Sequence, residues 1–155
     1  MRRGHALADL YLAIEPRLYA ELEEAGLLSD ARATARREWA CFALYACVRG
    51  LIAAGGFNRE TATAVESLHE RVLAASDEGA DAARRALLSE RYAEYGTIGQ
   101  TGGASAAATV GRRLGEAAAR HMAADGTAHE ALAEMAGSLH ESLAEGAAES
   151  VRQAE

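Results

Sequence analysis

The sequence predicts an all-α protein, and three features of the chain support that fold class. Alanine, the strongest helix former, dominates the hydrophobic half of the 155 residues. The strand-favouring residues Val, Ile and Thr are sparse, and Pro16 is the only proline. A chain of this length can bury a core of its own. We therefore predict one domain over residues 1–155, a bundle of five to six helices with the second helix (about 30–54) buried at its centre.

The prediction of a central helix rests on residues 39–57, WACFALYACVRGLIAAGGF. This stretch is apolar on every side of a helix, with Arg49 as its only charge, and such a helix belongs in a protein interior. It is slightly shorter than the ~20 residues that a membrane span needs, so we expect no membrane insertion. Cys41 and Cys47 are separated by a helical rise of roughly 9 Å, too far for a disulfide. Buried free thiols are typical of a reducing compartment, and we expect a cytoplasmic protein.

Amphipathic helices are predicted on both sides of this stretch. In the first, about residues 5–25, apolar residues recur at three- and four-residue steps. Pro16 lies within that pattern without shifting its phase, which predicts a kink rather than a stop. Asn58 is expected to cap the third helix, with Phe57 packing against Ala62 as a hydrophobic staple.

Glycines divide the second half of the chain. The fourth helix is predicted over about residues 80–95, because the glycines of the segment 96–103 should end it. A fifth helix follows this segment. Thr127 is expected to cap a sixth helix with Glu130 at its third position, as in a capping box. The tail after about residue 146 is expected to fray.

The charge balance narrows the classes of partner. The chain has 23 acidic residues against 16 basic ones, all of them arginine, for a net charge of -7. General nucleic-acid binding needs a basic face to neutralise phosphates, so we expect no nucleic-acid partner. Asp9 and Glu15 follow the N-terminal arginines and interrupt any apolar segment, so the pattern is not that of a secretory signal.

One region of the sequence predicts a ligand pocket. Backbone N–H groups exposed in the Gly-rich segment 96–103 could attract an anion, although the P-loop lysine and the G-x-G-x-x-G spacing are both absent. The alternative is that this segment is only a packing loop. Polar and aromatic residues gather just before and within it. The residues that we consider for the pocket are Arg49, His69, Arg91, Tyr92, Tyr95 and Gln100.

No motif for metal binding or catalysis is complete. Glu66 and His69 form a Glu-x-x-His pair, half of what a ferritin-like di-iron bundle needs, but a second pair is missing. A neutral core histidine bonded to a backbone carbonyl is the simpler explanation for His69. Arg49 needs a partner in its apolar stretch, and Glu66 or Glu94 could provide one. We expect no metal, no cofactor and no catalytic residue.

The last helix carries a narrow apolar seam with a spacing close to a heptad repeat. Glutamates lie along its other side, and His129 and His140 are expected to be surface residues on its flank. Such a seam is usually core, but it can also pair with a copy of itself or with another protein. The seam consists of Leu132, Met135, Leu139 and Leu143.

Two functions are compatible with these observations. The first is a non-enzymatic interaction protein that forms a homo-oligomer or binds a protein partner through its late amphipathic helices. The alternative is a small-molecule or metal-binding bundle with a pocket near His69 and the segment 91–100.

Overall fold

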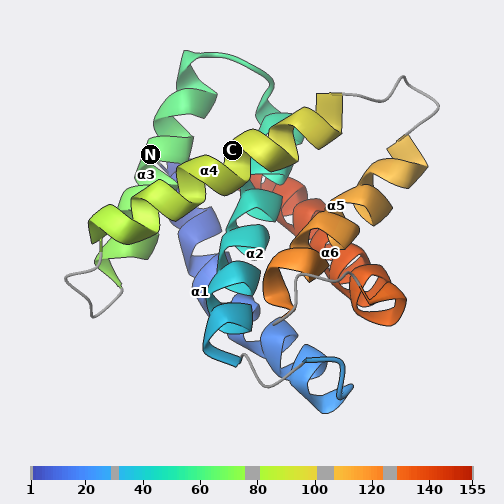
Figure 1. Ribbon diagram of the computed structural model, residues 1–155. Helices are drawn as coiled ribbons and strands as arrows, with labels where there is room; N and C mark the ends of the chain where they lie inside the picture. The colour runs from blue at the N-terminus through green and yellow to red at the C-terminus, as the bar shows by residue number, and fades with distance from the viewer. Residues whose placement is uncertain (1, 29–31, 76–80, 101–106, 124–128, 155) are drawn as a thin grey trace.

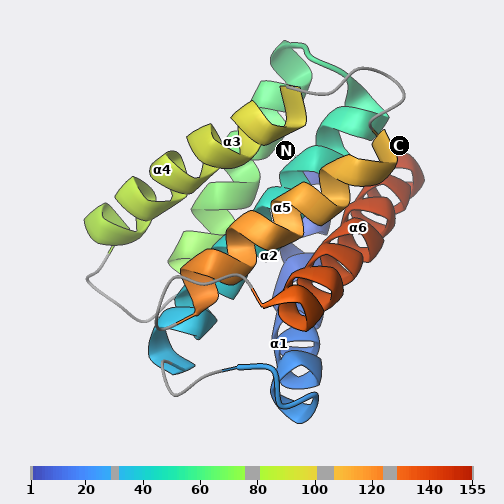
Figure 2. The same ribbon diagram turned by 45° about the vertical axis from the view of Figure 1, so that its right-hand side comes forward.

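The computed structural model describes residues 2–28, 32–75, 81–100, 107–123 and 129–154. These ranges contain six helices and no strand. The helices pack against one another as one bundle (Figure 1 and Figure 2), which confirms the predicted all-α fold class. Their bounds are α1 Arg2–Glu24, α2 Arg32–Gly55, α3 Arg59–Ala74, α4 Asp81–Gln100, α5 Ala107–Met122 and α6 Glu130–Gln153.

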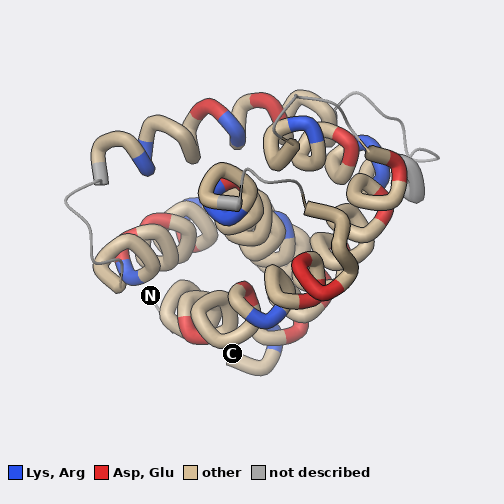
Figure 3. Tube along the Cα trace, turned by 60° about the horizontal axis from the view of Figure 1, so that its bottom comes forward, with Lys and Arg blue, Asp and Glu red and all other residues tan. Residues whose placement is uncertain are grey.

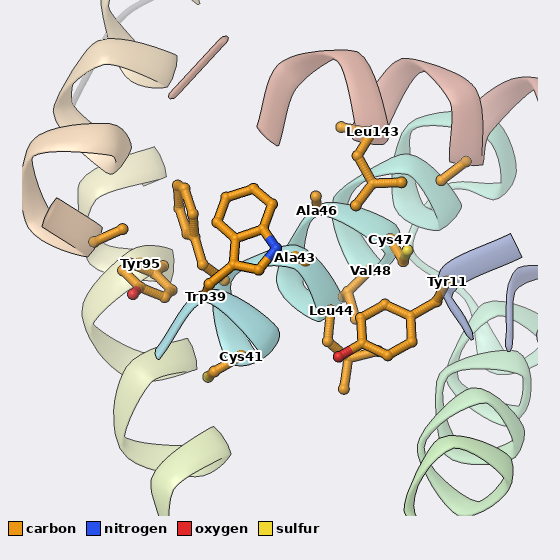
Figure 4. Packing of buried hydrophobic residues seen from close by; sticks show 14 of the residues in the cluster. Tyr11, Trp39, Cys41, Ala43, Leu44, Ala46, Cys47, Val48, Tyr95 and Leu143 are labelled. Atoms are coloured by element: carbon orange, nitrogen blue, oxygen red, sulfur yellow. The ribbon is translucent and has the colours of Figure 1, made fainter. Parts of the chain in front are cut away.

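Helix α2 is the central element of the bundle, as predicted. It packs against each of the other five described helices. Tyr95 of α4, Leu143 of α6 and Tyr11 of α1 lie around different sides of α2 (Figure 4). Trp39 and Phe42 of α2 are both fully buried, with their rings in an edge-to-face contact at 6.0 Å. A helix that is apolar on all sides buries that surface best when neighbours cover all of it.

The same helix is the one described span that could cross a membrane by its length and composition. That span is Ala33–Gly55, and 61% of its most apolar window is buried inside the bundle. A mostly buried helix of this kind is also what the core of a soluble protein requires.

Glycines allow three pairs of helices to approach backbone to backbone. A Cβ atom on Gly50 of α2 would lie 2.5 Å from the carbonyl oxygen of Ala144 and 2.6 Å from the Cβ of Ala147, both in α6. A Cβ on Gly115 of α5 would collide with the backbone of α6. A Cβ on Gly4 of α1 would lie 2.5 Å from the carbonyl oxygen of Ala64 in α3. These contacts require the absence of a side chain.

Two predicted helix ends differ from the structure. Helix α4 continues through Gly96 and Gly99 to Gln100, so this part of the expected loop is helical; residues 101–103 lie outside the described ranges. A glycine costs a helix only about 1 kcal/mol, and packing of Ile98 against the core offsets part of that cost. Helix α6 continues to Gln153 instead of fraying after residue 146, because Val151 and the alanines before it are buried.

The predicted caps are found in part. The Asn58 side-chain oxygen accepts a hydrogen bond of 2.8 Å from the Thr61 N–H, so the predicted cap of α3 is confirmed. Phe57 is 90% exposed and forms no staple. Helix α6 begins at Glu130 with His129 at the cap position and no side-chain cap bond, whereas Thr127 lies outside the described residues.

The crossing of α2 and α6 gives the first testable prediction. Gly50→Ala should lower the free energy of unfolding by about 1–3 kcal/mol, since the new methyl group must push α6 away from α2. Urea denaturation followed by circular dichroism measures the change.

Gly146→Ala in α6 is the matched control, because a Cβ there would meet no atom within 4 Å. This variant should be more stable by about 0.5–1 kcal/mol, the usual gain of alanine over glycine inside a helix. Equal effects of the two substitutions would contradict the close contact at Gly50.

Candidate functional site

Helix α4 is joined to α2 and α5 by side-chain hydrogen bonds to carboxylates. Arg91 of α4 donates hydrogen bonds of 2.8 and 3.0 Å to the carboxylate of Glu38 in α2, and the two side chains are only 14% and 8% exposed. His121 of α5 donates a hydrogen bond of 2.6 Å to Glu94 of α4. Charges of both signs alternate along α4 (Figure 3). These pairs fix α4 in one position relative to the central helix.

A third polar contact joins α4 to α3. The His69 Nδ1 atom lies 2.9 Å from the Val65 carbonyl oxygen, which can only accept, so Nδ1 carries the hydrogen. The Nε2 atom therefore accepts the Tyr92 O–H, at 2.8 Å. Burial lowers the pKa of His69, which keeps the imidazole neutral at pH 7. This arrangement agrees with the predicted neutral histidine bonded to a backbone carbonyl.

Aromatic contacts anchor the second half of α4 to α2. Tyr45 of α2 lies between two rings of α4, with centroid distances of 5.1 Å to Tyr92 and 5.4 Å to Tyr95. Phe42 contacts Tyr95 at 5.2 Å, and Tyr95 is fully buried. Aromatic pairs at such distances add to the stabilisation that burial provides.

A cleft of about 410 Å³ lies between α3 and α4. Its two leucines are buried and form its apolar part, while its charged residues are exposed. The His69–Tyr92 hydrogen bond connects its two walls. The α3 wall consists of Glu66, His69, Glu70 and Leu73, and the α4 wall of Arg85, Leu88 and Tyr92.

The cleft contains two of the six residues that the sequence suggested for a ligand pocket, His69 and Tyr92. Arg49 lies elsewhere and pairs with Glu141 of α6, so the expected partners Glu66 and Glu94 are both wrong. The reason is the α2–α6 crossing at Gly50, which brings α6 beside the preceding residue of α2.

The other three suggested residues, Arg91, Tyr95 and Gln100, belong to α4, and the first two do not line this cleft. Arg91 is engaged by Glu38, and Tyr95 is fully buried with a hydroxyl that has no hydrogen-bond partner among the described residues. Gln100 is the last residue of α4.

The seam of the last helix faces mainly the interior of this chain. Leu132 and Leu143 are buried, with exposed fractions of 1% and 4%. Met135 and Leu139 are half-buried and pack against the same core. Little of the seam is therefore available to a partner while the bundle keeps this conformation.

His140 differs most from its expected position at the surface. It is fully buried, and its ring stacks on Phe42 with a centroid distance of 4.0 Å. Its Nδ1 donates a hydrogen bond of 3.1 Å to the Phe42 carbonyl oxygen, while Nε2 has no partner among the described residues. Burial, assisted by the nearby Arg49 charge, lowers the pKa of His140 to about 3.

The cysteines and the possible metal ligands of the described residues offer little further chemistry. Cys41 and Cys47 are free, and burial raises the pKa of each thiol to about 12, which keeps both protonated and unreactive at pH 7. Within the described ranges, no group of three or more His, Cys, Asp or Glu residues is placed to hold a metal ion.

The cleft residues have a regular helical spacing in the sequence, although they belong to no complete motif. Glu66, His69, Glu70 and Leu73 have the spacing of one face of a helix. The α4 residues of the cleft likewise recur at three- and four-residue steps. Each wall could therefore be recognised as a helical stripe, but only the fold shows that the two stripes face each other.

Searches against protein-family models, curated proteins and solved structures found no match to this chain.

The buried His140 predicts a loss of stability in acid. Its pKa is about 3 in the folded state and about 6.5 when unfolded, so between these values the unfolded chain binds a proton that the folded chain does not. Stability is therefore lost as the pH falls below 6.5. From pH 7 to pH 5 this one group should remove about 2 kcal/mol. Urea denaturation at the two pH values measures the loss.

His140→Gln should be less stable at pH 7 but should lose about 2 kcal/mol less than the wild type between pH 7 and pH 5. His129→Gln, at an exposed position, is the control and should keep the wild-type pH dependence. An unchanged dependence in His140→Gln would show that His140 is not buried in the neutral form.

Proposed function

We propose that this protein is a small-molecule-binding helical bundle whose ligand occupies the cleft between α3 and α4. The observation that carries the proposal is the cleft itself, with two apolar residues and a hydrogen-bonded His69–Tyr92 pair. Ligand sites in bundles lie between helices and combine apolar surface with a few polar groups. A volume of about 410 Å³ falls within the usual range for such sites.

Binding is a better-supported role for the cleft than catalysis. The Nε2 lone pair of His69 accepts the Tyr92 hydrogen, so this imidazole is not poised as a general base. Burial raises the pKa of Tyr92 well above 10, so its hydroxyl stays protonated. The two free, buried thiols support a cytoplasmic location as part of the same proposal.

A fragment screen tests the proposal. Uniformly ¹⁵N-labelled protein is mixed with fragments at about 1 mM, a concentration that detects weak ligands. We expect several fragments to shift the backbone amides of Glu66, His69, Glu70, Arg85 and Tyr92 together.

A variant that fills the cleft is the control. Arg85→Trp should place an indole in the cleft and abolish these shifts, whereas Arg112→Trp, at an exposed position on α5, should leave them unchanged. A screen in which no fragment shifts the cleft amides would refute the proposed function.

A protein-interaction function remains a second proposal, because Met135 and Leu139 keep part of their surface exposed on α6. If α6 forms a homo-oligomer through them, native mass spectrometry should show a multimer that Leu139→Asp dissociates. The isolated Leu139→Asp monomer should stay folded by circular dichroism.

Leu132→Asp is the matched variant for the interior of the seam. Because Leu132 is buried within the chain, this change should unfold the monomer whether or not an oligomer exists. A wild-type protein that is monomeric at micromolar concentration would argue against self-association.

A further inference from the structure

We infer that the cleft between α3 and α4 selects organic cations, and that its ligand is a protonated amine with an adjoining apolar group. This inference rests on the proposed binding function and adds to it the chemical class of the ligand. It is carried by the charge of the cleft, by its hydrogen-bonding groups and by the position of its apolar residues.

The charge of the cleft favours a cation. Glu66 and Glu70 on the α3 wall each carry a negative charge, and Arg85 on the α4 wall carries a single positive one. His69 is neutral, since its Nε2 accepts the Tyr92 hydrogen and its Nδ1 donates to a carbonyl. The lining residues therefore sum to one net negative charge, which attracts an ammonium group and repels a carboxylate.

Neither carboxylate is neutralised by another residue in the described part of the chain. Glu66 and Glu70 also border a neighbouring hollow of about 370 Å³ that contains Arg71. The Arg71 guanidinium instead lies 3.6 Å from the Asp9 carboxylate of α1. Both glutamates thus remain available to a ligand.

The hydrogen-bonding groups also match an amine. The Tyr92 hydrogen is used by His69, so the Tyr92 oxygen offers the cleft only a lone pair. The carboxylates of Glu66 and Glu70 accept as well, which leaves Arg85 as the one charged donor of the lining. An ammonium group donates three hydrogen bonds and accepts none, so it complements a wall of acceptors.

The apolar group of the ligand has a defined place. Leu73 and Leu88 lie on opposite walls, and both are mostly buried, with exposed fractions of 3% and 7%. An aliphatic or aromatic group placed against them in the cleft would lose part of its contact with water, which is the main source of affinity for a small ligand. The ammonium group then lies toward the exposed carboxylates.

Three probes of similar shape and different charge test the inference: 2-phenylethylammonium, 2-phenylethanol and 3-phenylpropanoate. Each is titrated into ¹⁵N-labelled protein at pH 7, and the shifts of the cleft amides give Kd. We expect the ammonium probe to bind about three- to tenfold more tightly than the alcohol, the effect of two exposed ion pairs. The carboxylate probe should bind more weakly than the alcohol.

Variants of the charged residues show whether the cleft causes this order. Glu66→Gln combined with Glu70→Gln should bring Kd for the ammonium probe close to that of the alcohol. Arg85→Gln should tighten ammonium binding severalfold, because a like charge is removed. Glu145→Gln, at an exposed position on α6, is the control and should change nothing.

The salt dependence of the wild-type protein provides a second measurement that needs no variant. At 0.5 M NaCl the preference for the ammonium probe over the alcohol should fall, since salt screens exposed charges. Equal binding of all three probes in the cleft would overturn the cation inference but leave the proposed function standing. If none of the probes and none of the screened fragments shifts the cleft amides, both are refuted.

Discussion

The direct contact between α2 and α6 at Gly50 determines much of the rest of the structure. Because no side chain separates the helices there, α6 lies against the backbone of α2 over Ala144 and Ala147. The same contact places Arg49, which precedes Gly50 in α2, beside Glu141 of α6. It also brings His140 of α6 to the Phe42 carbonyl oxygen of α2. Close packing of small residues thus creates both an ion pair at the edge and a buried polar group in the core.

Helix α4 is attached by different means. Its contacts include hydrogen-bonded pairs with α2, α3 and α5, and in the pair with α2 both side chains are largely buried. Each pair holds its partners at a fixed distance and direction, whereas apolar contact is non-directional. The contact with α3 is made through His69 and Tyr92, and beside it the two helices stay apart and enclose the cleft. The hydrogen bond that attaches α4 to α3 therefore also joins the two walls of the proposed binding site.

The candidate site could be predicted from the sequence only in part. His69 stood out as a predicted core histidine and Tyr92 because it precedes the Gly-rich segment, and the structure brings the two together at 2.8 Å. Arg49 and Tyr95 were suggested for the same pocket, but Arg49 pairs with Glu141 of α6 and Tyr95 is buried in the core. Glu66, Glu70 and Arg85 resemble ordinary solvent-facing charges in the sequence, and they become a site because α3 and α4 face each other.

The sequence by itself determined the fold class, the central position of α2 and the cap at Asn58, because these depend on composition, on helical periodicity and on hydrogen bonds between near neighbours. Tertiary structure decided the rest. Whether Gly96 ends a helix, whether Leu132 faces the core and whether His140 is charged all depend on which surfaces meet. Local preferences of about 1 kcal/mol per residue are overridden by packing that buries whole side chains.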